Sequence, residues 1–298
     1  MNILLTGSTG LIGKALSRHL KTKGHNIYPL YRNPSTAKAH YWNPEEDQIH
    51  LDDQIKLHAV IHLAGENIAD SRWSQKKKDS ILNSRVHGTR LLAETISQLK
   101  HKPSLLISGS AIGYYGDTGD NIVDENSARG EGFLSDVAAQ WEAATQAAED
   151  ADIRTIHLRT GIVLSPEGGV LQKMLSPFRM GLGGVVGNGQ QYMSWISIND
   201  VVQIIDHMLN DEQLSGPYNL VAPKPVTNYT FTKTLGTVLH RPTVSPLPAF
   251  MARMIFGEMA DALLLSSSRV AATRLKTPGY IFIDNELKET LTNLLDNN

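Results

Sequence analysis

Cysteine is absent from the 298 residues, which excludes disulfide bonds and cysteine-ligated metals. An excess of charge of one sign is also absent. The chain has 28 Lys and Arg against 30 Asp and Glu, and a net charge of -2 does not suggest a nucleic-acid surface. No apolar run approaches the ~20 residues that span a bilayer, and "MNILLTGSTG" lacks the basic region of a secretory signal. We therefore expect a cytoplasmic globular protein without a nucleic-acid or membrane partner.

Histidine with acidic neighbours at metal-ligand spacing is lacking as well. His58, His62 and His87 each fall on a predicted strand or helix, and none has a His, Asp or Glu partner at the spacing that a metal site needs. We therefore expect these histidines in the core or on the surface, and we expect no metal site.

The first thirty residues predict a strand, a turn, a helix and a second strand in succession. Ile3, Leu4 and Leu5 form a short apolar run, as in a strand that is buried on both faces. Leucine and alanine then recur at helical spacing through "LIGKALSRHL". Gly24 ends this helix, and "NIYPLY" begins the next strand. This order is typical of a βαβ unit with parallel strands.

Three glycines, Gly7, Gly10 and Gly13, lie in the turn between that strand and helix. The backbone N–H groups and the dipole of a helix N-terminus favour an anion. A side chain at Gly7 or Gly10 would hold a pyrophosphate away from the backbone, and one at Gly13 would separate helix from strand. In this context the spacing predicts dinucleotide binding, and a tight turn without a ligand is the alternative.

The end of the second strand lacks the acid that selects NAD. NAD enzymes place Asp or Glu there to bond the ribose hydroxyls, but residues 25–44 contain neither. Arg32 stands in that place, and a guanidinium can pair with a 2′-phosphate and stack on adenine. The sequence therefore favours NADP over NAD, unless Arg32 is only a solvated loop residue.

Two further buried strands end in small or hydroxyl-bearing residues. "HAVIHLAGENI" (58–68) ends in Ala64 and Gly65, and "LLISGSAIGYYGD" (105–117) carries Ser110 and two tyrosines after its apolar run. In open α/β sheets, ligands collect at the carboxyl ends of the strands. These strand ends are therefore expected to line one crevice with the glycine turn.

Together these segments resemble an extended or atypical short-chain dehydrogenase/reductase of the NAD-dependent epimerase/dehydratase-like superfamily. The resemblance covers essentially the whole chain and is sharpest to its epimerase family proteins, a subgroup with a C-terminal domain of unknown function. The motifs that carry it are "AGENIADSRWSQKKKDSILNSRVHGT", "WEAA", "LRTGIVLSPEGGVLQKMLSPFRMGLGG", "GNGQQYMSWISINDVV" and "YNLVAPKPVTNYTF".

The resemblance implies an α/β fold, with a Rossmann-like doubly wound parallel sheet and a smaller C-terminal α/β lobe. The expected NAD(P)-binding domain covers residues 1–165, with a returning strand near 217–221. The expected substrate lobe covers 166–298 and includes the subgroup's own domain at about 245–295.

The resemblance also implies which residues meet the cofactor. The turn would wrap the pyrophosphate, the second strand end would meet the adenosine, and the third strand end would lie along ribose and adenine. Arg85, which stands where most extended members carry Asn, would reach the cofactor or substrate, and residues 160–163 would approach the nicotinamide. The implied cofactor residues are Gly7, Thr9, Gly10, Leu11, Ile12, Gly13, Tyr31, Arg32, Leu63, Ala64, Gly65, Arg85 and Val163.

The superfamily's Tyr-x-x-x-Lys pair is missing. Residues 134–149 predict an amphipathic helix in the place of the helix that carries this pair, but the aligned residues are Asp136 and Gln140. In the superfamily, the tyrosine moves the substrate proton, and the lysine lowers its pKa and holds the nicotinamide ribose. Asp136 cannot imitate a phenol, and Gln140 carries no charge that could depress a pKa. The usual mechanism cannot run from this helix.

Another proton donor is therefore needed if the protein catalyses redox chemistry. Tyr114 and Tyr115 are the nearest candidates, and Ser110 matches the superfamily's substrate-polarising hydroxyl. Glu66 and Asp136 are further options. The alternatives are that the tyrosines pack at the domain boundary and that Ser110 bonds to backbone.

The second half of the chain predicts a separate lobe. "GLGGVVGNG" (181–189) is either a flexible lid beside the substrate or a set of tight turns. The tail from residue 245 is rich in Met and Leu at helical spacing, which predicts mostly core residues. The alternative is an adaptable surface for an apolar ligand or a second subunit.

Two functions remain open at this point. One is an NADP-dependent nucleoside-diphosphate-sugar epimerase-like oxidoreductase that acts on an unspecified small substrate, which would be sugar-nucleotide-like. The alternative is a non-catalytic NADP-binding sensor or scaffold protein. Long helices at 74–98 and 134–149 could also pair into a homodimer, as in relatives.

Overall fold

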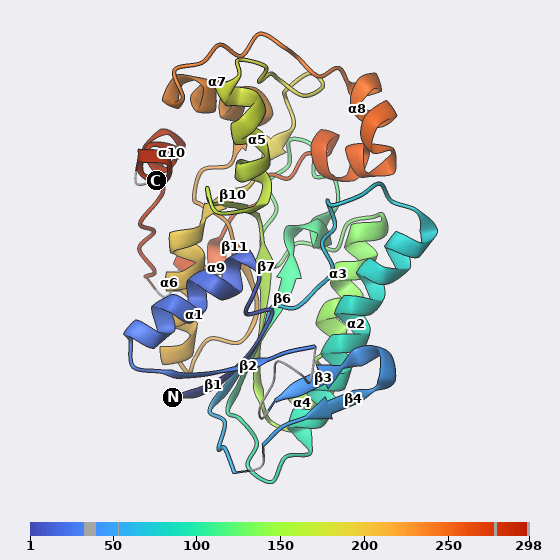
Figure 1. Cartoon of the computed structure of the whole chain (residues 1–298), viewed down its shortest axis with the longest axis vertical. Helices are drawn as coiled ribbons and strands as arrows, with labels where there is room; N and C mark the ends of the chain where they lie inside the picture. Colours follow the sequence, from blue (N-terminus) through green and yellow to red (C-terminus); the bar gives the residue numbers. More distant parts are fainter. Residues whose placement is uncertain (33–39, 53, 277–278, 297–298) are drawn as a thin grey trace.

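A six-stranded parallel sheet forms the centre of the computed structural model (Figure 1), which describes residues 1–32, 40–52, 54–276 and 279–296. The strand order is β11-β7-β6-β5-β1-β2, and every neighbouring pair is parallel. The expected α/β fold with a Rossmann-like sheet is confirmed. The strands of this sheet are β1 (Asn2–Thr6), β2 (Asn26–Leu30), β5 (Ala59–His62), β6 (Leu105–Ala111), β7 (Arg154–Thr160) and β11 (Gly216–Leu220).

Helices cover both faces of the sheet, which explains why its strands read as continuous apolar runs. On one face α1 (Leu11–Thr22) and α6 (Ile198–Asn210) pack on a core that contains Leu16 and Ile205. On the other face α2 (Gln75–Ser97) packs on a core that contains Leu92. Figure 1 shows α1 and α6 on one side and α2, α3 (Phe133–Ala143) and α4 (Gln146–Glu149) on the other.

The helix expected over 134–149 is interrupted. α3 ends at Ala143 and α4 begins at Gln146, with Thr145 between them. The Thr145 hydroxyl donates to the carbonyl of Glu142 at 2.8 Å and lies 2.9 Å from His157 Nε2 on β7. Side-chain bonds of this kind compete with the helical backbone pattern, and here they accompany the change of direction.

A second, smaller lobe stands beyond the carboxyl ends of the strands, at the top of Figure 1. Its core joins Leu171 and Leu175 to Phe231 and Leu291. Its helices are α5 (Gly169–Arg179), α7 (Asn228–Val238), α8 (Ala249–Phe256) and α10 (Leu287–Asp296).

Short elements complete the described chain. Two small sheets pair β8 (Ile162–Leu164) with β10 (Trp195–Ser197) and β9 (Tyr192–Met193) with β12 (Val226–Thr227). A third pairs β3 (Tyr41–Asn43) with β4 (Gln48–His50). The remaining helices are short: two 3-10 helices, η1 (Pro44–Glu46) and η2 (Ile112–Tyr115), a π-helix, η3 (Ala260–Leu265), and an α-helix, α9 (Thr273–Lys276).

Segment 181–189 is tied to the chain that follows α7. The N–H of Ser245 donates to the Gly183 carbonyl, and the N–H of Leu247 donates to the Val185 carbonyl. Gly187 and Gly189 have positive φ. These contacts are those of a set of tight turns rather than of a free lid.

The prediction of a mostly buried Met-rich tail is wrong for α8. Phe250, Met251, Met254 and Ile255 are all exposed, although Met259 after the helix is buried. Helical spacing identified the helix but did not say which of its faces would find a partner. No helix in the described part of the chain is long and apolar enough to cross a membrane.

Candidate functional site

The glycine turn lies between β1 and the N-terminus of α1. The Gly10 N–H donates to the Gly7 carbonyl at 3.0 Å, which closes the turn. α1 has no acidic residue in its first turn and no side-chain cap at Gly10. The first N–H groups of α1 therefore remain available to an anion.

Each glycine of the turn is needed for a different reason. Gly7 has φ +67°, and a Cβ there would lie 2.7 Å from the Leu63 carbonyl carbon. A Cβ at Gly13 would lie 2.1 Å from Gly7 O, so Gly13 packs on the turn itself. A Cβ at Gly10 would meet only Gly7 O, at 3.3 Å. The open space is therefore at Gly10, while the other two positions are restricted by the protein's own backbone.

Leu11 and Ile12 contribute to this turn through their backbone. Their side chains pack on the core that reaches into the second lobe, and Leu11 also lies against Gly168. Thr9 and Gly10 are exposed at the outer side of the turn. Val163, on β8, is partly buried and packs against both the sheet core and the core of the second lobe.

The end of β5 is held against the end of β1 by Thr6. The N–H groups of Leu63 and Ala64 each donate to Thr6 Oγ1 at 3.1 Å, and His62 Nδ1 lies 2.7 Å from the same oxygen. Because this oxygen already accepts two N–H groups, its own proton goes to Nδ1 of His62. Thr6 thus fixes the segment Leu63–Gly65 beside the glycine turn.

Arg85 of α2 lies against this segment. Its guanidinium carbon would be 3.3 Å from a Cβ at Gly65 and lies 5.1 Å from the ring of Trp141. Burial lowers the pKa of Arg85 to about 10, with Glu66 opposing the shift, so the side chain stays cationic at neutral pH. Arg85 forms no ion pair with any carboxylate of the described residues. This positive charge is available to a phosphate or a ribose hydroxyl.

The end of β2 presents Tyr31 and Arg32. Tyr31 forms an isolated parallel β-bridge with Tyr41, and the Tyr31 carbonyl accepts the N–H of Trp42 at 2.9 Å. Arg32 is exposed and has no ion pair within the described part of the chain. Its position is at the strand end that is expected to meet the adenosine.

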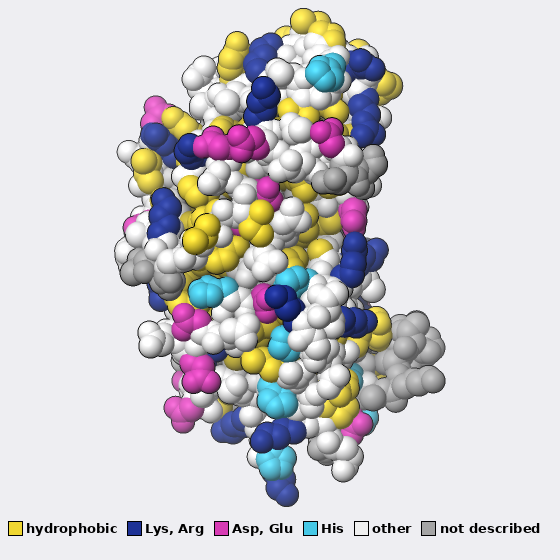
Figure 2. Space-filling view, turned by 90° about the vertical axis from the view of Figure 1, so that its left-hand side faces the viewer, with side chains coloured by type: hydrophobic (Ala, Val, Ile, Leu, Met, Phe, Trp, Pro, Cys, Tyr) yellow, Lys and Arg dark blue, Asp and Glu magenta, His cyan; other side chains and the backbone are white. Residues whose placement is uncertain are grey.

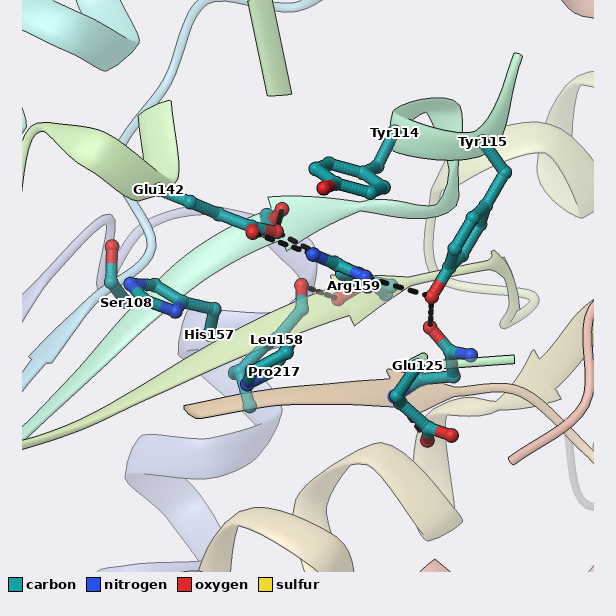
Figure 3. A network of polar contacts seen from close by, with 12 residues as sticks. Ser108, Tyr114, Tyr115, Glu125, Glu142, His157, Leu158, Arg159 and Pro217 are labelled. Carbon is teal, nitrogen blue, oxygen red and sulfur yellow. Dashed lines mark hydrogen bonds and ion pairs between the residues drawn. The ribbon is translucent and has the colours of Figure 1, made fainter. Parts of the chain in front are cut away.

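A buried polar network lies behind the ends of β6 and β7 (Figure 3). Arg159 of β7 donates from Nε and Nη2 to the two carboxylate oxygens of Glu142, both at 2.8 Å. Its Nη1 donates to the Tyr115 hydroxyl at 2.9 Å. Burial alone would lower the pKa of Arg159, but the bonds and charge of Glu142 raise it instead. The pair is a two-point charge-assisted contact inside the protein.

Ser110 and Tyr115 are both part of this network. Ser110 Oγ donates to Glu142 Oε1 at 2.6 Å. The Tyr115 hydroxyl donates to Asn219 Oδ1 at 2.8 Å, and burial raises the pKa of Tyr115 to about 12 although Arg159 opposes the shift. Both hydroxyl protons are thus engaged in bonds to other side chains. Ser110 bonds to the Glu142 carboxylate and not, as its structural alternative had it, to backbone.

Tyr114 differs from its neighbour. Its ring lies 3.5 Å from the guanidinium carbon of Arg159, and Figure 3 shows it on one face of that group. Its hydroxyl has no hydrogen-bond partner among the described residues, and the side chain is only partly buried. Of the three candidate hydroxyls, that of Tyr114 remains available to a substrate.

The acidic alternatives are paired. Asp136 is exposed and accepts from Arg129 Nη1 at 2.8 Å, and Gln140 is exposed on the same helix. Glu66 accepts from Lys77 Nζ at 2.6 Å. No group of three or more His, Asp and Glu in the described part of the chain could hold a metal.

Sequence reasoning missed Glu142, Arg159 and Asn219 as members of the site. Glu142 follows Trp141 in the "WEAA" motif. That motif indicated the family, but it did not indicate that Glu142 binds Arg159 and Ser110. Arg159 and Asn219 lie on β7 and β11, which pair side by side in the sheet. Their partnership depends on the sheet order, which the local pattern does not contain.

Comparison with known proteins extends this picture. A sequence model of the NAD dependent epimerase/dehydratase family matches residues 3–220, and one of a domain of unknown function, DUF1731, matches 247–294. An epimerase family protein of Mycobacterium tuberculosis is 40% identical over 290 residues, which are 97% of this chain and 96% of that protein. One of Bacillus subtilis is 36% identical over 306 residues, covering 99% and 98%.

Two solved structures are similar over nearly the whole of this chain. The crystal structure of human epimerase family protein SDR39U1 with NADPH has a TM-score of 0.90 at 33% identity and 100% coverage of both chains. That of a nucleoside-diphosphate sugar epimerase from Corynebacterium glutamicum has a TM-score of 0.80 at 32% identity, covering 99% of this chain and 58% of that one. The strand order, the glycine turn and these matches agree, and the chain belongs to the NAD dependent epimerase/dehydratase family.

Proposed function

We propose that the protein is an NADP-dependent oxidoreductase of the epimerase type that acts on a small, sugar-nucleotide-like substrate. One observation carries this proposal. Open space at Gly10 lies at the uncapped N-terminus of α1, while Arg85 beside Gly65 and Arg32 at the end of β2 have no described acidic partner. This arrangement suits a diphosphate with a further phosphate at the adenosine end. The NADPH bound to the human relative supports the choice of cofactor.

The residues of the chain have separate parts in this proposal. Backbone N–H groups of Leu11 to Gly13 would bind the pyrophosphate in the open space at Gly10, and Leu63 to Gly65 would lie along the ribose. Arg85 supplies the positive charge that Gln140 cannot. Bound NADP would supply hydride transfer at its nicotinamide ring.

Tyr114 is the proposed proton donor and acceptor. The Arg159 guanidinium stacks on the Tyr114 ring and holds the side chain in place, while Glu142 binds the same guanidinium. A general acid must reach the substrate oxygen with a free proton, and the Tyr114 hydroxyl has no described partner to release first. The name of the Corynebacterium protein supports a nucleoside-diphosphate sugar as the substrate class.

Turnover of nicotinamide with a panel of nucleoside-diphosphate sugars tests the proposal. Replacing Tyr114→Phe should lower kcat by about 10²- to 10⁴-fold, because general acid–base catalysis contributes that much. Asp136→Ala is the matched control and should leave kcat nearly unchanged, since Asp136 is bonded to Arg129 at the surface. Equal rates for Tyr114→Phe and wild type would overturn the role of Tyr114.

The sensor or scaffold alternative is favoured by the missing pair, since Asp136 and Gln140 offer no tyrosine and no cation on α3. NADPH binding without turnover of any substrate in the panel would support that alternative. A chain that neither binds NADPH nor reacts would contradict both functions.

A further inference from the structure

Acidic residues are unevenly distributed along the chain. Residues 168–199 and 213–257 contain no Asp or Glu, yet they carry six of the 28 Lys and Arg. These segments form α5, α7 and α8, which make up the upper end of the second lobe in Figure 1. α5, α7 and α8 themselves therefore carry Lys and Arg but no Asp or Glu, whereas acidic residues of the same lobe lie after α8 and on α10.

Large apolar side chains protrude from the same end. On α8, Phe250 and Met254 are 64% and 68% exposed, and Met251 and Ile255 beside them are exposed as well. Before α8, Val244 is 75% exposed. The segment after α5 adds the exposed side chains of Met180 and Leu182. Apolar clusters of this kind on a soluble domain mark contact surfaces.

Backbone contacts bring the two apolar segments together. Residues 183–185 accept hydrogen bonds from 245–247, and Arg241 Nε donates to the Arg179 carbonyl at 2.8 Å. We call this surface the lobe apex. Figure 2 shows the face of the molecule away from α8, and hydrophobic, Lys or Arg and His side chains lie at its upper end. The lobe apex consists of Met180, Leu182, Val244, Phe250, Met251, Met254 and Ile255 with Arg179, Arg241 and Arg253.

Two cations of the lobe apex are not neutralised. Arg179 and Arg241 are exposed and form no ion pair within the described residues, whereas Arg253 pairs with Asp261 at 2.8 Å. Exposed guanidiniums in the same segments as the exposed Met180, Leu182 and Val244 match the chemistry of a lipid headgroup region. Lipid phosphates attract the cations, and the apolar tips enter the boundary with the acyl chains.

We propose that the lobe apex docks the protein on a membrane surface that contains anionic lipids. The contact is peripheral, since no described helix could span a bilayer. The expectation of no membrane partner rested on the lack of a spanning segment and of a signal, and neither observation addresses a surface contact.

A second copy of the chain is a poorer occupant. A contact between two copies would bring Arg179 and Arg241 of both copies into one interface, and the lobe apex contains no acidic side chain to pair with them. Like charges at such a contact disfavour it. An anionic lipid surface instead complements a patch in which every unpaired charge is positive.

Co-sedimentation of the full chain with vesicles tests this inference, with phosphatidylcholine alone compared with phosphatidylcholine plus phosphatidylglycerol. We expect binding to the anionic vesicles, weakened by salt because the attraction is screened. The variant R179Q/R241Q should bind about thirtyfold more weakly, since each surface cation contributes about 1 kcal/mol. The variant F250S/M254S should lose about tenfold or more because less apolar surface is buried.

The matched control is I281S/I283S, which removes two exposed apolar side chains outside the lobe apex and should bind as wild type does. Circular dichroism should show all variants folded, because every changed residue is exposed. Absence of binding, equal binding to neutral vesicles, or an equal loss in the control would overturn the inference. So would a dimer in sedimentation velocity that F250S/M254S dissociates while no vesicles are bound, since a second copy would then cover the patch.

Discussion

Ser110 and Tyr115 keep their hydroxyl groups inside a buried network with Glu142, Arg159 and Asn219. Such a network is strong when every member is paired, and costly when one partner is removed. A ligand that used either hydroxyl would have to replace a bond of this network. Tyr114 can act without that cost, which is why the proton-handling role is assigned to it.

The sequence was most informative at positions where the backbone conformation alone determines which residue type is possible. Gly7 and Gly13 could be found from the sequence because positive φ and close backbone approach exclude other residues there. The pairing of Glu142 with Arg159 could not be found, because it joins a helix to a strand across 17 residues of chain. Residues of this kind are set by tertiary packing, which no local pattern encodes.

Arg32 is the residue that we expect to make the protein prefer NADP over NAD. Replacing Arg32→Gln should weaken NADPH binding about 10- to 100-fold, because a charge-assisted contact to the 2′-phosphate contributes about 1.5–3 kcal/mol. NADH lacks this phosphate, so its affinity should hardly change. Fluorescence titration with both nucleotides measures the two losses. Arg18→Gln, on the exposed side of α1, should change neither affinity, and equal losses for both nucleotides in Arg32→Gln would refute the phosphate contact.

At the scale of elements, local patterns located most of the strands and helices that carry the turn. They failed where side chains from distant segments intervene. The break between α3 and α4 coincides with the contact of Thr145 with His157 of β7, and α8 exposes a face that its apolar spacing suggested was buried. In both cases the helical spacing correctly predicts a helix. Where the helix ends and which of its faces is buried depend on residues far away in the sequence, which the spacing does not identify.

The link between β1 and β5 should make stability depend on pH. Burial lowers the pKa of His62 to about 4, from 6.5 in the unfolded chain. The unfolded state therefore binds a proton first as pH falls, so native stability is full above about pH 6.5 and is lost down to about pH 4. The expected loss is about 3 kcal/mol, an upper estimate from the 1.36 kcal/mol that each pKa unit represents.

Urea unfolding at a series of pH values measures this loss. In His62→Asn the fall in unfolding free energy between these pH values should shrink by about the same 3 kcal/mol. The control His101→Asn changes an exposed histidine outside the sheet and should leave the fall unchanged. An identical pH profile for His62→Asn and wild type would show that His62 is not the linked group.

At the scale of the whole molecule, the returning strand and the second lobe were expected from family resemblance more than from pattern, and the order of the strands was not predicted. Repeated βαβ units predict a parallel sheet, but they do not say that β11 returns to its edge from beyond the lobe. Charge segregation was also present in the sequence, as long segments without acid. The sequence alone did not show that these segments share a surface. The fold brings residues 179–182 and 241–255 to one end of the molecule.

The account depends most on the open space at Gly10 as the seat of the cofactor's pyrophosphate. Titration of the full chain with NADPH, followed by nicotinamide fluorescence, tests it directly. Wild type and the control Lys21→Val, at the far end of α1, should both bind NADPH with enhanced fluorescence. Gly10→Val should remain folded by circular dichroism and show no enhancement, because its side chain fills the space beside the N–H groups of α1. Equal enhancement in Gly10→Val, or none in wild type, would contradict the account.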